Sequence, residues 1–154
     1  GDIDNKNAWG VPLTETFIPE YLHEAGSYTV TFGARHLGTP ATDFLPTSRG
    51  FDQQSGLYNA QGDHYEHTID GGYDWHVDEV TRPALRGNYS GNLVRDDAVG
   101  FIRATNATTP FFLYVAFQEA HSPYQVLWSA LPLLFSSLLF SPLLFSCLPF
   151  SSHA

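Results

Sequence analysis

Residues 110–118 read Pro-Phe-Phe-Leu-Tyr-Val-Ala-Phe-Gln, a nearly unbroken run of apolar residues that favour β-strands. Such a run is typical of a strand that is covered on both faces, as in a parallel sheet. The polar residues Gln118, Glu119 and His121 lie at the end of this run or shortly after it. Because active sites of open α/β sheets gather at the carboxyl ends of strands, we expect functional side chains here.

Two further elements are predicted nearer the N-terminus. Residues 13–26 have apolar side chains at helical spacing, with Thr14 or Thr16 as the N-cap and Gly26 as the stop signal. Residues 27–33 are rich in strand-forming residues and end on a glycine. This order predicts a helix, a short turn and then a strand.

The middle of the chain shows weaker patterns. Residues 34–56 are punctuated by Gly and Pro, and residues 57–88 are polar, so we expect a loop followed by mostly irregular surface structure. Residues 90–104 carry an apolar stripe opposite charged residues, which predicts a second helix. Helices thus alternate with buried strands, and the sequence predicts an α/β layered architecture.

The charge of the chain argues against two classes of partner. The 154 residues include 7 Lys and Arg against 16 Asp and Glu, for a net charge of −9. A chain this acidic is repelled by phosphate backbones and by anionic membrane surfaces, so no nucleic acid or lipid surface is expected as a partner. The single cysteine, Cys147, allows no internal disulfide.

Composition changes sharply near residue 120. No Asp, Glu, Lys or Arg occurs after Glu119, and residues 127–154 form a low-complexity tail rich in Leu, Phe and Ser. Phe recurs there every five residues, a period that gives no continuous apolar face in a helix or a strand. Ser and Pro interrupt the apolar run, so a membrane span is not favoured. We expect residues 1–126 to form the folded part and the tail to be disordered or artefactual.

One polar segment suggests a metal site. It reads Asp63-His64-Tyr65-Glu66-His67, and further Asp and His residues follow it. Two histidines three residues apart on a loop are a weak metal-binding signal. A solvated loop without tight zinc binding is therefore the favoured interpretation.

Two triplets fit the N-glycosylation acceptor pattern. They are Asn88-Tyr-Ser90 and Asn106-Ala-Thr108. Both flank the predicted second helix, where exposure at the surface is expected. Asn88 and Asn106 are therefore candidate glycosylation sites.

Three segments resemble the sulfatase family in order and in approximate spacing. Residues 21–38 pass from Glu-Ala-Gly through a strand into His-Leu-Gly, similar to a family segment that ends in G-K-W-H-L-G. Residues 45–52 resemble the family segment L-P-T-x-R-G-F-D, and residues 110–126 resemble P-F-F-L-Y-L-A-F-Q-x-x-H-x-P-L-Q-V. Together the matches look closest to sulfatases of the arylsulfatase B type.

This resemblance implies a fold and a reaction. The family fold is a large α/β sandwich similar to alkaline phosphatase, so residues 1–126 would be an incomplete part of a sulfatase catalytic domain. The family hydrolyses sulfuric esters with a formylglycine made from the cysteine of a C-x-P-S-R motif, and a calcium ion bound by carboxylates and an Asn polarises the sulfate. The implied substrates are sulfated glycans or small aryl sulfates, and the implied location is lysosomal or secreted.

The resemblance transfers roles to few residues of this chain. His36 matches the His of the H-L-G segment, which implies a catalytic base in sulfate release. His121 matches the His after the buried strand, which implies contact with sulfate and proton donation to the leaving group. Ala34 stands where the family has a Lys, and Arg35 stands in the place of the Trp. The charge of Arg35 would partly substitute for the missing cation, in a different geometry.

Other parts of the family site find no match in the 154 residues. No C-x-P-S-R occurs, and Cys147-Leu-Pro149 has the C-x-P without the S-R. None of the calcium ligands of the family is matched either. We therefore expect this chain to be inactive by itself. Two alternatives to a sulfuric ester hydrolase stay open: a non-catalytic sulfatase-like module that binds glycans or a partner, and a non-functional product of a truncated gene.

Overall fold

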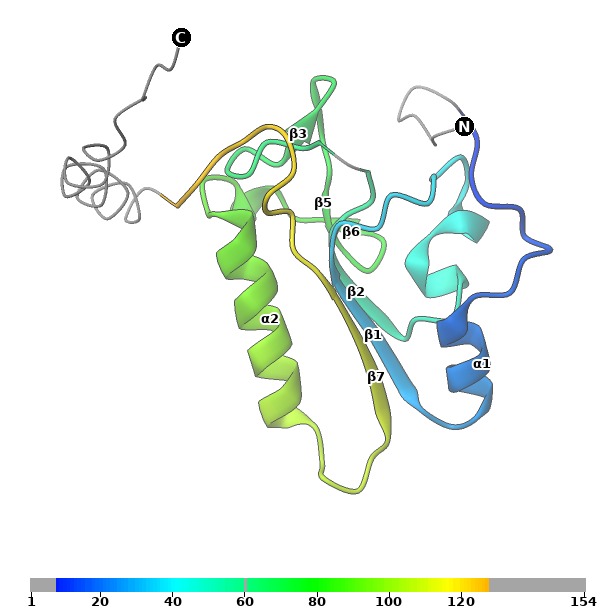
Figure 1. Cartoon of the computed structure of the whole chain (residues 1–154). Helices are drawn as coiled ribbons and strands as arrows, with labels where there is room; N and C mark the ends of the chain where they lie inside the picture. The colour runs from blue at the N-terminus through cyan, green and yellow to red at the C-terminus, as the bar shows by residue number, and fades with distance from the viewer. Residues whose placement is uncertain (1–7, 60, 128–154) are drawn as a thin grey trace, which may run out of the picture.

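The computed structural model describes residues 8–59 and 61–127, which form a five-stranded mixed sheet with helices on both sides (Figure 1). In sheet order the strands are β6 (Val80–Thr81), β5 (Trp75–Val77), β2 (Gln53–Leu57), β1 (Tyr28–Gly33) and β7 (Phe111–Ala116). β1 pairs in parallel with both β2 and β7, whereas β5 and β6 add antiparallel pairs. The predicted α/β architecture is confirmed.

Short elements fill the connections between these strands. A separate two-stranded hairpin is formed by β3 (Thr68–Ile69) and β4 (Gly72–Tyr73). Single 3-10 turns span Thr42–Phe44, Pro46–Ser48 and Pro83–Leu85.

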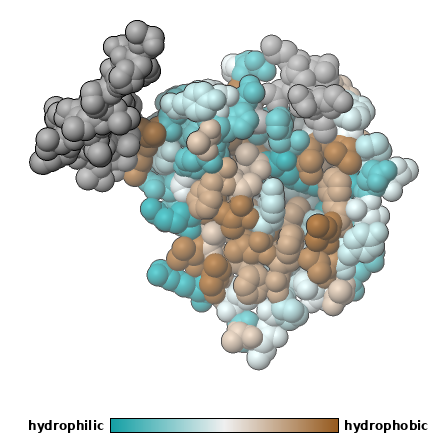
Figure 2. Space-filling model, in the orientation of Figure 1, coloured by the Kyte–Doolittle hydropathy of each residue, from teal (hydrophilic) through white to brown (hydrophobic). Residues whose placement is uncertain are grey.

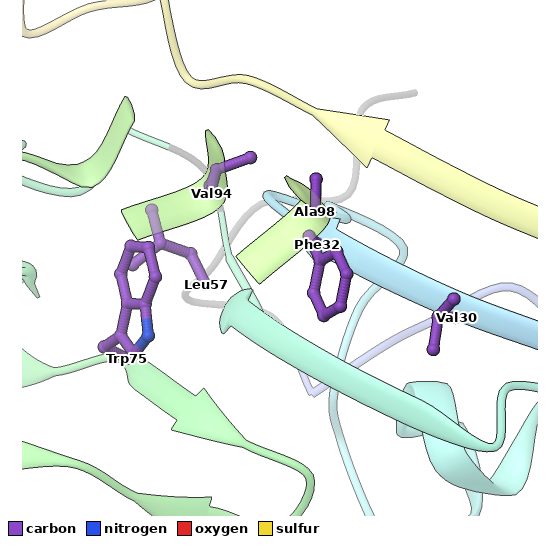
Figure 3. Close-up of a cluster of buried hydrophobic side chains, with 6 residues drawn as sticks. All are labelled: Val30, Phe32, Leu57, Trp75, Val94 and Ala98. Carbon is purple, nitrogen blue, oxygen red and sulfur yellow. The ribbon is translucent and has the colours of Figure 1, made fainter. Parts of the chain in front are cut away.

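The main core lies between the sheet and α2 (Ser90–Ala104). Six buried side chains from the sheet and α2 form it, as Figure 3 shows: Val30, Phe32, Leu57, Trp75, Val94 and Ala98. α1 (Ile18–Glu24) contacts β1 from the other side of the sheet (Figure 1). The helix predicted at 90–104 is confirmed with the same bounds, because its apolar stripe is the surface that this core buries.

The first helix is shorter at its start than predicted. α1 begins at Ile18 with Phe17 as the N-cap residue, so the expected cap at Thr14 or Thr16 is wrong. The Glu20 carboxylate instead accepts a hydrogen bond of 2.6 Å from the Phe17 backbone N–H. This bond satisfies a backbone donor of the kind that is left free at a helix start.

The predicted stop of this helix is confirmed. Gly26 has a φ of 87°, a conformation that glycine adopts without a Cβ penalty. Its N–H donates to the His23 carbonyl at 2.9 Å, and the Ser27 N–H donates to the Leu22 carbonyl at 2.9 Å. These two bonds form a Schellman motif, which turns the chain directly into β1.

The central strand β2 was not predicted. Its sequence, Gln53-Gln-Ser-Gly-Leu57, lies in the segments expected to be loop and irregular structure, as do β5 and β6. Polar residues form a buried strand here because the backbone pairs on both sides and the Gln54 amide is satisfied. Gln54 Nε2 lies 3.2 Å from the carbonyl oxygens of both His76 and Asp78. Tertiary pairing thus overrides weak β-propensity.

The apolar strand β7 is confirmed as a strand parallel to β1, but the expectation that both its faces are covered is wrong. Within the described residues β7 lies at the edge of the sheet, and Phe111 and Tyr114 are 43% and 46% exposed. Figure 2, drawn in the orientation of Figure 1, shows apolar side chains gathered over the middle of the face that is turned to the viewer. The helices pack mainly on the neighbouring strand β1, so β7 is only partly covered.

No helix within residues 8–59 and 61–127 is long and apolar enough to cross a membrane. The predicted tail, from residue 128 onward and including Cys147, lies outside the described residues.

Candidate active site

Two candidate catalytic histidines lie on loops that follow the carboxyl ends of two neighbouring strands. Gly33, the last residue of β1, pairs with Ala116, the last residue of β7. His36 follows three residues after β1, and His121 follows five residues after β7. Because the two strands are parallel neighbours, both loops leave the same edge, at the top of the sheet in Figure 1. Both histidines are exposed, as a group that meets a substrate must be.

His36 lies in an unusual backbone conformation. Its φ is 61°, a left-handed value that costs a non-glycine residue on the order of 1–3 kcal/mol. Other non-glycine residues also have a positive φ, among them His67 and Asp78, so the role of His36 stays a prediction.

The residues before His36 project to opposite sides of the sheet. Ala34 packs against the core cluster on the α2 side. The Arg35 guanidinium lies over the rings of Phe17 and Phe51, with 5.2 and 5.6 Å from Cζ to the ring centroids. These rings lie on the α1 side of the sheet. The Arg35 side chain therefore projects to the side opposite the one from which a lysine at position 34 would extend. The expected difference in geometry is confirmed, and the partial substitution by Arg35 stays a prediction.

His121 is held by its own loop. Its backbone N–H donates to the Gln118 carbonyl at 2.8 Å, and its Nδ1 lies 2.9 Å from the Ser122 carbonyl oxygen. A carbonyl oxygen only accepts hydrogen bonds, so Nδ1 carries a proton and donates. In the neutral side chain this leaves Nε2 as the ring nitrogen without a proton.

The loop that carries His121 is hydrogen-bonded to the segment of residues 62–66. Gln118 is 5% exposed, and its Nε2 donates to the Gly62 carbonyl. The Gln125 side chain makes two bonds of 2.6 Å, accepting from the His64 N–H and donating to the Asp63 carboxylate. The segment suspected as a metal site therefore anchors the His121 loop. Sequence reasoning pointed to Gln118 as a polar residue at the end of the strand but missed Gln125, although it lies in a matched segment.

The Asp63 carboxylate is the central acceptor of these hydrogen bonds. It also accepts hydrogen bonds from the backbone N–H groups of Tyr65 and Glu66, at 2.8 and 2.6 Å. Burial raises the pKa of Asp63, but these bonds and the Gln125 amide outweigh burial, so the pKa lies below its ordinary value. Asp63 is therefore held as an anion by hydrogen-bond donors.

The expected solvated loop is wrong for its two histidines. His64 and His67 are 1% and 0% exposed, because their rings pack on Tyr89 and Trp75 at centroid distances of 5.7 and 4.6 Å. Both nitrogens of His64 and Nδ1 of His67 are buried without a hydrogen-bond partner. Within residues 8–59 and 61–127 no three His, Cys, Asp or Glu side chains are grouped so that they could hold a metal ion.

The burial of His67 predicts a pH effect on stability. Burial lowers the pKa of His67 below 6.5, against the opposing effects of its hydrogen bond to Leu85 and of nearby carboxylates. Between pH 6.5 and the lowered value the unfolded chain binds more protons than the folded chain, so the free energy of unfolding falls as pH falls. A His67→Gln chain is expected to lose less stability than wild type between about pH 7.5 and about pH 5.5. Thermal denaturation at both values checks this, and equal losses would contradict it.

The two candidate glycosylation sites are accessible. Asn88 and Asn106 are both exposed, one before α2 and one after it. Their modification stays a prediction.

Comparison with known proteins decides the family. A family model described as Sulfatase matches residues 2–130. This chain belongs to the sulfatase family. Arylsulfatase J of Mus musculus is 36% identical to this sulfatase over 121 residues, which cover 75% of this chain and 20% of that protein. N-acetylgalactosamine-6-sulfatase of Homo sapiens is 30% identical over 140 residues, which cover 83% of this chain and 26% of that protein.

Solved structures share the fold of this sulfatase. The crystal structure of Ps i-CgsB in complex with k-i-k-neocarrahexaose aligns with a TM-score of 0.73 and 22% identity, covering 84% of this chain and 32% of that chain. The structure of BT4656 in complex with D-glucosamine-2-N,6-O-disulfate aligns with a TM-score of 0.51 and 23% identity, covering 80% and 24%. The predicted family and the incomplete sulfatase fold are confirmed, and the chain spans about a quarter of the length of the curated relatives it matches.

Proposed function

We propose that this chain is a segment of the catalytic domain of a sulfuric ester hydrolase and that it supplies His36 and His121 to the sulfate pocket. The observation that carries the proposal is the parallel pairing of β1 and β7, since the two histidines follow the carboxyl ends of these neighbouring strands. His36 acts as the base in the step that releases sulfate. His121 contacts the sulfate and donates a proton to the departing alcohol.

The substrates in this proposal are sulfated sugars or small aryl sulfates. Both relatives reported above are named as sulfatases, and the BT4656 structure holds a sulfated glucosamine. The enzyme in this proposal is lysosomal or secreted and carries glycans on Asn88 and Asn106. Residues 1–126 belong to its catalytic domain, and residues 127–154 are a separate low-complexity segment.

The remaining parts of the site come from outside these residues in the proposal. The described residues contain no grouping that fits calcium, so the calcium ligands of the enzyme lie elsewhere in this proposal. The chain also has no C-x-P-S-R from which the nucleophile of the family is made. The 154 residues on their own are therefore proposed to be inactive, and activity requires the rest of a sulfatase domain.

A segment exchange tests this function. Residues 8–127 replace the corresponding segment of mouse arylsulfatase J, a relative with 36% identity over 121 residues. Ala34→Lys in this chimera restores a cation at the carboxyl end of β1, and stabilisation of transition-state charge is worth a few kcal/mol. We expect measurable hydrolysis of 4-nitrophenyl sulfate that rises on the order of a hundredfold with Ala34→Lys.

The same chimera separates the alternatives. Gly100→Lys is the added-lysine control, because Gly100 lies on the exposed surface of α2 and a Cβ there would meet nothing within 4 Å. This change adds the same charge away from the candidate site and should leave turnover unchanged. If both the chimera and its Ala34→Lys form fold but neither turns over substrate, the non-catalytic module or the truncated product replaces the enzyme proposal.

A further inference from the structure

A groove of about 350 Å³ lies on the α1 side of the sheet, away from the core that Ala34 joins. Four aromatic rings line it, from the start of α1, the turn before β2, and β7: Phe17, Phe51, Phe112 and Tyr114. Among the described residues that line it, Arg35 is the charged one. An apolar cavity with one fixed polar group is the usual form of a small-molecule site.

The Arg35 guanidinium is poorly satisfied in this groove. Nη1 has one long hydrogen bond, of 3.4 Å, to the Phe44 carbonyl, and Nη2 is buried with no partner. Burial and the nearby charge of Arg49 lower the pKa of Arg35 to about 10, so the group remains a cation at neutral pH. A buried, unpaired donor on a cation is costly and favours an added acceptor.

Glu20, the acid whose charge acts on Arg35, is already engaged. Glu20 accepts the Phe17 N–H at 2.6 Å, and its carboxylate lies 3.7 Å from Arg49 Nη2. Arg35 forms no ion pair within residues 8–59 and 61–127. A partner that is anionic and aromatic would match both the unpartnered Nη2 of its guanidinium and the four rings.

We propose that this groove binds an aromatic monocarboxylate, with its ring among the four aromatic side chains and its carboxylate accepting hydrogen bonds from Arg35. A neutral aromatic ligand would leave the cation unpaired. The nearby Arg49, which lies over the Phe17 ring, is already held by Glu20 and by two backbone carbonyls, so a polyanion would gain no further partner there. The net charge of −9 would also repel it. The groove lies on the side of the sheet to which Arg35 projects, opposite the side on which Ala34 packs.

Titration of the full chain with 2-naphthoate, followed by NMR of the arginine side-chain N–H signals, tests the proposal. We expect the Arg35 signal to shift and 2-naphthalenemethanol, a neutral analogue, to bind about tenfold more weakly, since hydrogen bonds to charged groups are the stronger ones. Arg35→Met should weaken 2-naphthoate binding by about tenfold or more and leave the neutral analogue unchanged.

Matched variants keep the outcome decisive. Arg95→Met removes an exposed arginine of α2, which pairs with Asp96 at 2.7 Å, and should leave binding unchanged. Arg35→Lys keeps the charge without the planar fork and should give an intermediate affinity. Equal affinity for both ligands, or unchanged binding in Arg35→Met, would overturn the proposal. The assay measures binding alone, so it is independent of sulfatase turnover.

Discussion

Gly33→Ala is expected to lower the free energy of unfolding by about 3 kcal/mol, the sum of backbone strain and overpacking. Gly33 has a φ of 111°, and a Cβ at this position would lie 1.8 Å from the Ala116 carbonyl oxygen of β7. That oxygen cannot move freely, because it accepts the Ala34 N–H at 3.1 Å. The contact lies at the edge from which both candidate histidine loops depart.

The neighbouring strand β2 also requires a glycine where it approaches β1. Gly56 has a φ of 144°, and a Cβ there would lie 2.2 Å from the Gly33 carbonyl oxygen. Three backbones thus converge at the carboxyl ends of β2, β1 and β7. Relief of one contact by a shift of β1 would tighten the other.

Thermal denaturation followed by circular dichroism measures the loss. Gly71→Ala is the matched control, because Gly71 also has a positive φ, of 83°, but a Cβ there would meet nothing within 4 Å. This control should lose only about 1 kcal/mol, from backbone strain alone. Equal losses in the two chains would show that the close approach of β1 and β7 is not limiting.

The parts of the fold that were predicted from sequence are those with local patterns. α2 has an apolar stripe at helical spacing, and its predicted bounds of 90–104 agree with the structure. The stop at Gly26 and the strand at β1 also follow from local chemistry. β2 has no such pattern, since it is buried by strands that pair with it on both sides. A single-sequence pattern does not contain that information.

The candidate site also contains residues that were predicted from local motifs and residues that were missed because their partners are distant in sequence. His36 and His121 could be proposed because each lies in a segment with a recognisable motif, and their roles stay predictions. The burial of His64 was missed because its partners are distant in sequence: Gln125 bonds its backbone, and Tyr89 covers its ring. The loop looked solvated from its composition, but the Gly62 carbonyl and the Asp63 carboxylate accept hydrogen bonds from the loop that follows β7.

Replacing His36 and replacing His121 are expected to slow different steps of the reaction. Each test uses the arylsulfatase J chimera with Ala34→Lys, so that the starting rate is high enough to measure a loss. General acid–base catalysis contributes typically about 10²–10⁴-fold, which sets the size of each effect. His23→Gln is the control, because His23 lies in α1 before the amino end of β1, at the other edge of the sheet from the candidate site.

His36→Ala is expected to slow the release of sulfate and to spare the first step. With 4-nitrophenyl sulfate, the enzyme should release about one equivalent of 4-nitrophenol quickly and then turn over about 10²–10⁴-fold more slowly. Stopped-flow absorbance measures the burst and the steady rate separately. Loss of the burst itself would contradict the role of His36 in the second step.

His121→Ala is expected to slow the first step, and by an amount that depends on the leaving group. A sugar hydroxyl is a weak acid and needs a proton as it departs, so turnover of a sulfated sugar should fall about 10²–10⁴-fold. 4-Nitrophenol departs readily as an anion, so 4-nitrophenyl sulfate should lose much less. The Ser122 carbonyl accepts from Nδ1 of His121 and leaves Nε2 to deliver the proton. Equal losses on both substrates would mean that His121 binds sulfate without donating a proton.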